Sequence, residues 1–174
     1  LKIRLLDNSQ QIIVGLEINN LGFLQAKHHI ALNTLHVVLV GDMLQPEALF
    51  LMGTAYAEAL GVTVNLKKAA EFYTQAAKMN HTLAMHNLGN VFGDGIGVEK
   101  NLFQASHWWR RAAENGDTIP MLRLAELYLS GEGGMRDVMR ACYWIKQSSQ
   151  RGNSNAEMIL QQRFDGECTE TNYK

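Results

Sequence analysis

Apolar and polar residues follow one another along most of this chain with the spacing of helices that bury one face. Over residues 66–78, alanine, leucine and tyrosine recur at intervals of three and four, and lysine, glutamate, threonine and glutamine fill the positions between them. Since an α-helix turns once in about 3.6 residues, this spacing gathers the apolar side chains on one side. Helices are also expected at three other places: 46–59, 82–94 and 118–130.

The pattern returns every 36 residues between Pro46 and Gly152. The main matching sets are Gly53, Gly89 and Ala125; Tyr56, Phe92 and Tyr128; Gly61, Gly97 and Gly133; Asn65, Asn101 and Asp137; and Phe72, Trp108 and Trp144. The asparagines and the aspartate stand where an N-cap side chain begins the second helix of each period. A pair of helices cannot cover its apolar faces alone, so the repeat predicts an all-α fold, a superhelix (solenoid) of stacked antiparallel helix pairs.

The small residues inside the first helix of each period indicate where the paired helix comes closest. Gly53 and Gly89 occupy equivalent places, and Ala125 takes the same place in the third period. We therefore expect a bulky side chain at Gly53 or Gly89 to clash with the paired helix.

The repeated residues resemble the Sel-one-like repeat, a relative of the tetratricopeptide repeat. The second period carries that motif most completely: Ala84, Leu88-Gly89, Phe92, Gly95-Ile96-Gly97-Val98, Asn101, Ala105, Trp108-Trp109, Ala112-Ala113 and Gly116. The other two periods depart at Ala59, Gly134, Ile145 and serines 148–149. The resemblance implies three Sel-one-like repeats plus a C-terminal capping helix over residues 46–163.

The two ends of the chain lie outside the regular repeats. A shift of 38 places Gly15 on Gly53 and Ala31 on Ala69, so residues 1–45 are interpreted as a degenerate N-terminal helical repeat or cap. Residues 164–174 are polar and are expected to form a frayed tail.

Composition excludes several classes of protein. Sixteen Lys and Arg residues stand against 17 Asp and Glu residues, a balance that argues against nucleic-acid binding. No apolar run reaches the length of a membrane span. The sequence begins at Leu1 rather than Met, which leaves room for a removed signal peptide, so the localisation stays open between cytoplasm and periplasm.

The sequence offers no catalytic, cofactor or metal motif. The run Gly93-Asp94-Gly95-Ile96-Gly97 follows a predicted helix, whereas phosphate loops follow a strand, so it is interpreted as an inter-helix turn. The six histidines lack the spacing of a zinc site. Cys142 lies on the apolar stripe of its helix and is expected to be a buried, inert thiol. We therefore expect no enzyme activity, no cofactor and no bound metal.

The resemblance to tetratricopeptide-like solenoids implies that a partner binds on the concave face, which is lined by the first helix of each repeat. Residues at fixed offsets from the Gly53 position form the candidate site: Phe50, His86, Leu122 and Met158; Thr54, Asn90 and Glu126; Glu58 and Asp94. Acids outnumber bases among them, which favours a partner with some basic character. An alternative is that several of these residues only contact the neighbouring repeat.

Three functional hypotheses follow from these features. The first is a non-enzymatic scaffold or adaptor that binds another protein or peptide on the concave face. The second is a bacterial immunity protein that neutralises a cognate toxin, since small members of the family resemble proteins of such pairs. The third, a hydrolase, is disfavoured because no activated nucleophile is visible. Self-association stays open, because an uncapped end repeat can stack on a second copy of itself.

Overall fold

The computed structural model describes residues 2–6, 12–17, 46–60, 62–134 and 136–164. The chain divides into two compact parts, an N-terminal part up to His81 and a C-terminal part from Thr82 onwards.

The N-terminal part begins with two strands. β1 (Lys2–Leu6) pairs antiparallel with β2 (Ile12–Glu17), with Lys2 opposite Glu17 and an irregularity in the register between Leu5 and Leu6. The helical interpretation of residues 1–45 is therefore wrong over these two segments, and residues 18–45 lie outside the described residues. Both segments are rich in isoleucine, leucine and valine, and β-branched residues favour a pleated strand.

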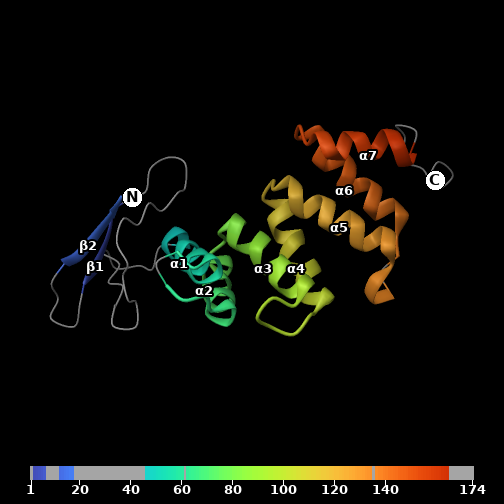
Figure 1. Cartoon of the computed structure of the whole chain (residues 1–174). Coiled ribbons are helices and arrows are strands. Elements are labelled where there is room, and N and C mark those ends of the chain that lie inside the picture. Colours follow the sequence, from blue (N-terminus) through green and yellow to red (C-terminus); the bar gives the residue numbers. More distant parts are fainter. Residues whose placement is uncertain (1, 7–11, 18–45, 61, 135, 165–174) are drawn as a thin grey trace. The chain divides into compact units, whose positions relative to one another are not determined.

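The N-terminal part continues with one helix pair. α1 (Pro46–Glu58) packs against α2 (Leu66–Lys78), and Figure 1 shows both in cyan to green. The Asn65 side chain accepts a hydrogen bond from the Lys68 backbone N–H at 3.0 Å, which starts α2 as an N-cap.

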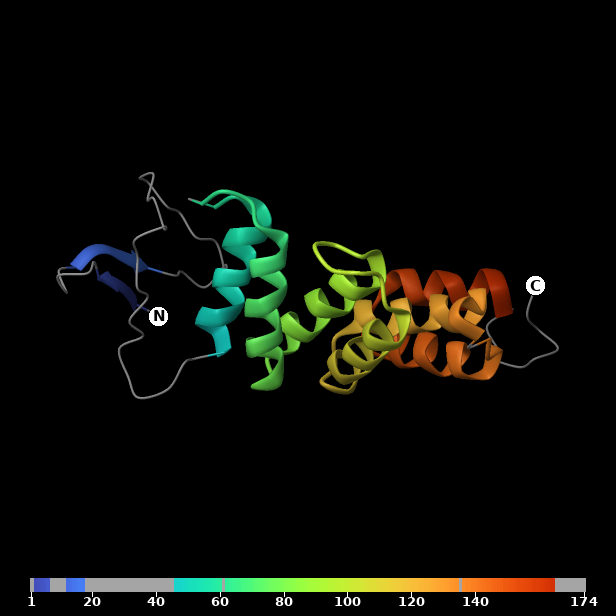
Figure 2. The ribbon, with the colours of Figure 1, turned by 90° about the horizontal axis from the view of Figure 1, so that it is seen from below.

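The C-terminal part consists of two further helix pairs and a final helix. Its elements are α3 (Thr82–Asp94), α4 (Leu102–Glu114), α5 (Thr118–Ser130), the short 3-10 turn η2 (Glu132–Gly134), α6 (Val138–Gln150) and α7 (Ser154–Phe164). Each helix packs against the next one along the chain, and Figure 2 shows α5, α6 and α7 lying side by side. The predicted all-α class and the 36-residue helix pairs are confirmed for residues 46–164.

Equivalent polar contacts recur in all three pairs. Asn101 and Asp137 cap α4 and α6 through the backbone N–H groups of Gln104 and Arg140, at 3.0 and 2.9 Å. The backbone N–H of each cap residue also donates to a carbonyl near the end of the preceding helix, and the pairs are Asn65 to Tyr56, Asn101 to Phe92 and Asp137 to Tyr128. These bonds fix the length of the loop between the two helices of a pair.

The core of the C-terminal part continues to the last described residue. Phe164 is fully buried in the cluster formed by α4 to α7, together with Met121, Leu124 and Ile145. Phe164 thus ends α7 and does not belong to a frayed tail; residues 165–174 lie outside the described residues.

Cys142 differs from its prediction in one respect. The side chain is buried, with 1% of its surface exposed, but it is disulfide-bonded rather than a free thiol. The other cysteine of the chain, Cys168, lies outside the described residues.

Candidate partner-binding site

In the first two helix pairs, an aromatic ring of the second helix lies against a glycine of the first. A Cβ atom added to Gly53 would come within 2.6 Å of Tyr73 Cδ1, and one added to Gly89 within 2.2 Å of Trp109 Cδ1. The indole of Trp109 also covers Gly93, where an added Cβ would lie 2.6 Å from the ring. Glycine is therefore required for this close approach, as the repeat pattern predicts.

Each of these rings also has a polar partner on the first helix. The Tyr73 hydroxyl donates to Thr54 Oγ1 at 3.3 Å, and Trp109 Nε1 donates to Asn90 Oδ1 at 3.0 Å. In both pairs the two residues are 19 positions apart. The hydrogen bond fixes the ring in place along the first helix.

The third pair replaces this arrangement. Ala125 stands at the glycine position and Ile145 at the ring position, and both are buried, with 2% and 1% of their surface exposed. Glu126 stands where Thr54 and Asn90 bind the ring, but isoleucine has no group to donate to it. The Glu126 side chain is 72% exposed and lies 3.5 Å from Arg123 Nη1, a long and solvated ion pair.

A groove opens at this place, between α5 and α7. It has a volume of about 620 Å³, and Ile145 of α6 contributes to its wall. Its apolar residues are Ile119, Leu122, Ala125, Leu129, Ile145 and Ile159. Its polar residues are Arg123, Glu126, Ser130 and Arg163. An apolar surface with a few polar groups is typical of a site that binds a ligand or a peptide segment.

The three helix pairs match a known family of repeat proteins. The profile described as the Sel1 repeat matches residues 46–81, 82–117 and 121–153, which together make up more than half of the chain. This protein belongs to the Sel1 repeat family. Helical repeats of this kind typically mediate protein–protein interaction.

Solved structures of Sel1 repeat proteins are similar to this chain. A Sel1 repeat protein from Oxalobacter formigenes is 29% identical with a TM-score of 0.63, and the match covers 67% of this chain and 50% of that one. A protective antigen of uropathogenic Escherichia coli with an SLR fold is 34% identical with a TM-score of 0.64, over 68% of this chain and 26% of that one. This chain thus spans about half and about a quarter of the lengths of these two proteins.

A more distant structure shows the same fold. The cysteine-rich protein B of Helicobacter pylori is 20% identical with a TM-score of 0.54, over 69% of this chain and all of that one. A comparison with curated proteins gives no significant match.

Two of the three predicted site residues of the first Sel1 repeat take part in contacts within that repeat. Phe50 stacks on His81, with 4.7 Å between ring centroids, and also contacts the Tyr73 ring at 5.9 Å. Thr54 donates to the Phe50 carbonyl and accepts from Tyr73. Glu58 is exposed at the end of α1.

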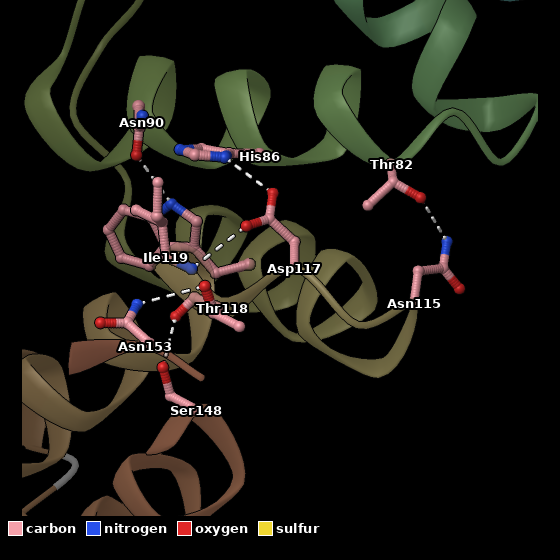
Figure 3. Close-up of polar contacts among 10 residues, drawn as sticks. Thr82, His86, Asn90, Asn115, Asp117, Thr118, Ile119, Ser148 and Asn153 are labelled. Atoms are coloured by element: carbon pink, nitrogen blue, oxygen red, sulfur yellow. Dashed lines mark hydrogen bonds and ion pairs between the residues drawn. The ribbon is translucent and has the colours of Figure 1, made fainter. Parts of the chain in front are cut away.

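Two of the three predicted site residues of the second Sel1 repeat, His86 and Asn90, also make contacts with other side chains of the chain. His86 Nδ1 lies 2.9 Å from Asp117 Oδ2, and both side chains are largely buried, with 13% and 12% exposed (Figure 3). Asn90 binds Trp109, as described above, and Asp94 is exposed at the end of α3. Phe50, Thr54 and Asn90 thus contact residues of their own repeat rather than of the neighbouring one, whereas His86 contacts Asp117, the N-cap residue of α5.

The third Sel1 repeat and α7 carry the remaining predicted residues. Leu122 and Glu126 line the groove, whereas Met158, which is 50% exposed, does not. The structure therefore brings together two of the nine predicted residues and adds neighbours that the sequence analysis missed, notably Arg123, Leu129, Ile159 and Arg163. Leu129 could have been found, since it lies seven residues after Leu122 on the same helical face.

The groove has a different balance of charge from the nine predicted residues. The lining includes two arginines and one glutamate, so the local balance is basic rather than acidic. Among the described residues, no group of three or more potential metal ligands occurs. Within the same residues, no helix combines the length and the apolar character that crossing a membrane requires.

Proposed function

We propose that the chain is a non-enzymatic interaction scaffold whose third Sel1 repeat binds a segment of a partner protein in the groove between α5 and α7. The observation that carries this proposal is the exchange of the glycine and aromatic pair for Ala125 and Ile145. In the second repeat, the Trp109 ring covers Gly89 and Gly93. In the third repeat, the corresponding Ala125 and Leu129 belong to the lining of the groove instead, with Ala125 buried at its base.

The proposal rests further on the character of the surface. Ile119 is 52% exposed, and Leu122, Leu129 and Ile159 are half-buried beside it. A partner side chain that covers them buries apolar surface, which stabilises the complex by about 25 cal/mol for each Å² removed from water. Glu126 and Arg123 at the rim are exposed and able to orient a peptide backbone or a polar side chain.

The test uses the tagged full chain to capture partners from the source cell, followed by titration of each purified partner by calorimetry. We expect Leu129→Asp to weaken binding by about tenfold or more, because it places a charge in the apolar centre of the interface. Phe103→Asp is the matched control, since Phe103 is 75% exposed on α4 outside the groove. Equal affinity of the Leu129→Asp and unmodified chains, with helical content unchanged, would contradict the proposal.

A second variant tests the groove without adding a charge. The fourfold change Ala125→Gly, Glu126→Asn, Leu129→Gly and Ile145→Trp gives the third repeat the residues that the second has at these positions. We expect the new indole to fill the groove and abolish binding, while circular dichroism shows unchanged helicity. The immunity-protein alternative gains no support of its own from the groove, because a toxin and an adaptor's client would meet the same residues.

A further inference from the structure

Arg163 provides a cation at the edge of the groove. It lies in the last turn of α7 and is exposed. Among the described residues, no carboxylate lies within ion-pair distance of its guanidinium. Arg123, on the α5 side, makes a long contact with Glu126. The groove thus places an arginine on each of the two helices that border it.

Both arginines are particular to this place in the chain. One period earlier, the residues equivalent to Arg123 and Arg163 are Asn87 and Leu127. Leu127 is buried, with 5% of its surface exposed, so the α7 position carries a charge where α5 carries a core residue. The basic rim therefore accompanies the open groove and is not a feature of every repeat.

Arginine selects for a particular chemistry. Its planar guanidinium donates two parallel hydrogen bonds to a carboxylate, which adds geometric specificity to the charge attraction. The apolar wall beside it, formed by Leu122, Leu129 and Ile159, suits an aliphatic or aromatic side chain. A ligand that fits both features carries a carboxylate next to a large apolar residue.

We propose that the groove recognises a short peptide segment of a partner protein in which an aspartate, a glutamate or a terminal carboxylate lies beside a large apolar side chain. Arg163 binds the carboxylate, and the wall between α5 and α7 binds the apolar residue. This inference rests on the proposed function and names the chemistry of the partner.

The experiment selects peptides on the full chain from a random dodecapeptide library displayed on phage. We expect the recovered peptides to be enriched in aspartate or glutamate next to leucine, isoleucine or phenylalanine. A selected peptide is then synthesised with its acid and with the corresponding amide, and both are titrated by fluorescence anisotropy. The acid form is expected to bind about tenfold more tightly, as one charge-assisted contact would give.

Variants of Arg163 test whether this side chain binds the carboxylate. We expect Arg163→Gln to lower the affinity for the acid peptide by about tenfold and to leave the affinity for the amide peptide unchanged. Arg163→Lys keeps the positive charge but cannot make two parallel hydrogen bonds. Its affinity for the acid peptide is therefore expected to lie between those of the unmodified chain and Arg163→Gln. Lys146→Gln is the matched control, since Lys146 is exposed on α6 and does not line the groove.

The outcomes separate this inference from the proposed function. Enrichment of basic or purely apolar peptides, or equal binding of acid and amide forms, would overturn the carboxylate assignment. If those same peptides still lose affinity with Leu129→Asp, the groove itself stands. Peptides whose binding is unaffected by Leu129→Asp and by the fourfold variant would overturn the groove as well.

Discussion

At the residue scale, a single exchange of side chains distinguishes the third repeat from the other two. Tyr73 and Trp109 each need a glycine opposite them, because an added Cβ would lie only 2.6 and 2.2 Å from the nearest ring atom. Ile145 is smaller and tolerates Ala125, and its shape leaves space beside α7. The same exchange frees Glu126 from the hydrogen bond that Thr54 and Asn90 make.

Ala59 allows a prediction at this scale. Its φ of 58° lies in the left-handed region, where the equivalent Gly131 also lies at 72°. Alanine is strained there by about 1–2 kcal/mol, whereas glycine is not. We expect Ala59→Gly to raise the free energy of unfolding by about 0.5–1 kcal/mol in urea titrations, since the flexible unfolded glycine offsets part of the gain.

The control for this change is a glycine in a regular helix. Ala55 lies inside α1 and is buried, so Ala55→Gly is expected to lower the free energy of unfolding by about 1 kcal/mol. If Ala59→Gly were also destabilising, the left-handed conformation at residue 59 would be wrong.

At the element scale, the two helices of a pair are held at a separation that the small residue and the ring set together. We expect Gly89→Ala to destabilise the chain by about 1–3 kcal/mol, because the methyl group overlaps the Trp109 indole. Trp109→Ile should relieve that overlap, since the double variant reproduces the Ala125 and Ile145 combination of the third repeat.

A double-mutant cycle measures this coupling. The Gly89→Ala, Trp109→Ile variant is expected to be more stable than the sum of its single changes by about 1–2 kcal/mol, measured by chemical unfolding. Gly89→Ala combined with Phe103→Ala serves as the control pair and should be additive within about 0.5 kcal/mol, because the Phe103 side chain is 75% exposed. Additive behaviour of the first pair would show that ring and glycine do not meet.

The same scale explains why part of the site escaped prediction. Residues at equal offsets, such as Leu122 and Met158, mark the same face of successive helices. A groove between two helices is lined by their facing sides, and these are different faces of the repeat. For this reason α5 contributes Leu122 and Glu126, whereas α7 contributes Ile159 and Arg163.

At the scale of the whole molecule, stability is distributed among neighbouring elements rather than concentrated in one core. In the C-terminal part each helix packs mainly against the next one along the chain. Phe164, fully buried at the end of α7, is therefore tied to the last repeat and not to the first.

We expect Phe164→Ala to lower the free energy of unfolding by about 3–5 kcal/mol, because it leaves a cavity in the core. Hydrogen exchange should show faster exchange of the amides in α6 and α7, with the protection of α1 and α2 unchanged. Gln162→Ala, an exposed change in the same helix, is the control and should alter neither. Uniform loss of protection along the chain would contradict local coupling.

The repeat can be predicted from the amino-acid sequence alone. Helix boundaries, N-caps and small residues recur at a fixed period because local hydrogen bonding and helical spacing depend on neighbouring residues. The position of the groove at the third repeat is evident only from the packing of the helices. The groove depends on the combined side-chain volumes of residues on three helices, Ala125, Ile145 and Ile159. The 36-residue pattern contains no information about this combination. The hairpin of β1 and β2 was missed for a related reason, since strand pairing is a contact between segments and a helical template does not contain it.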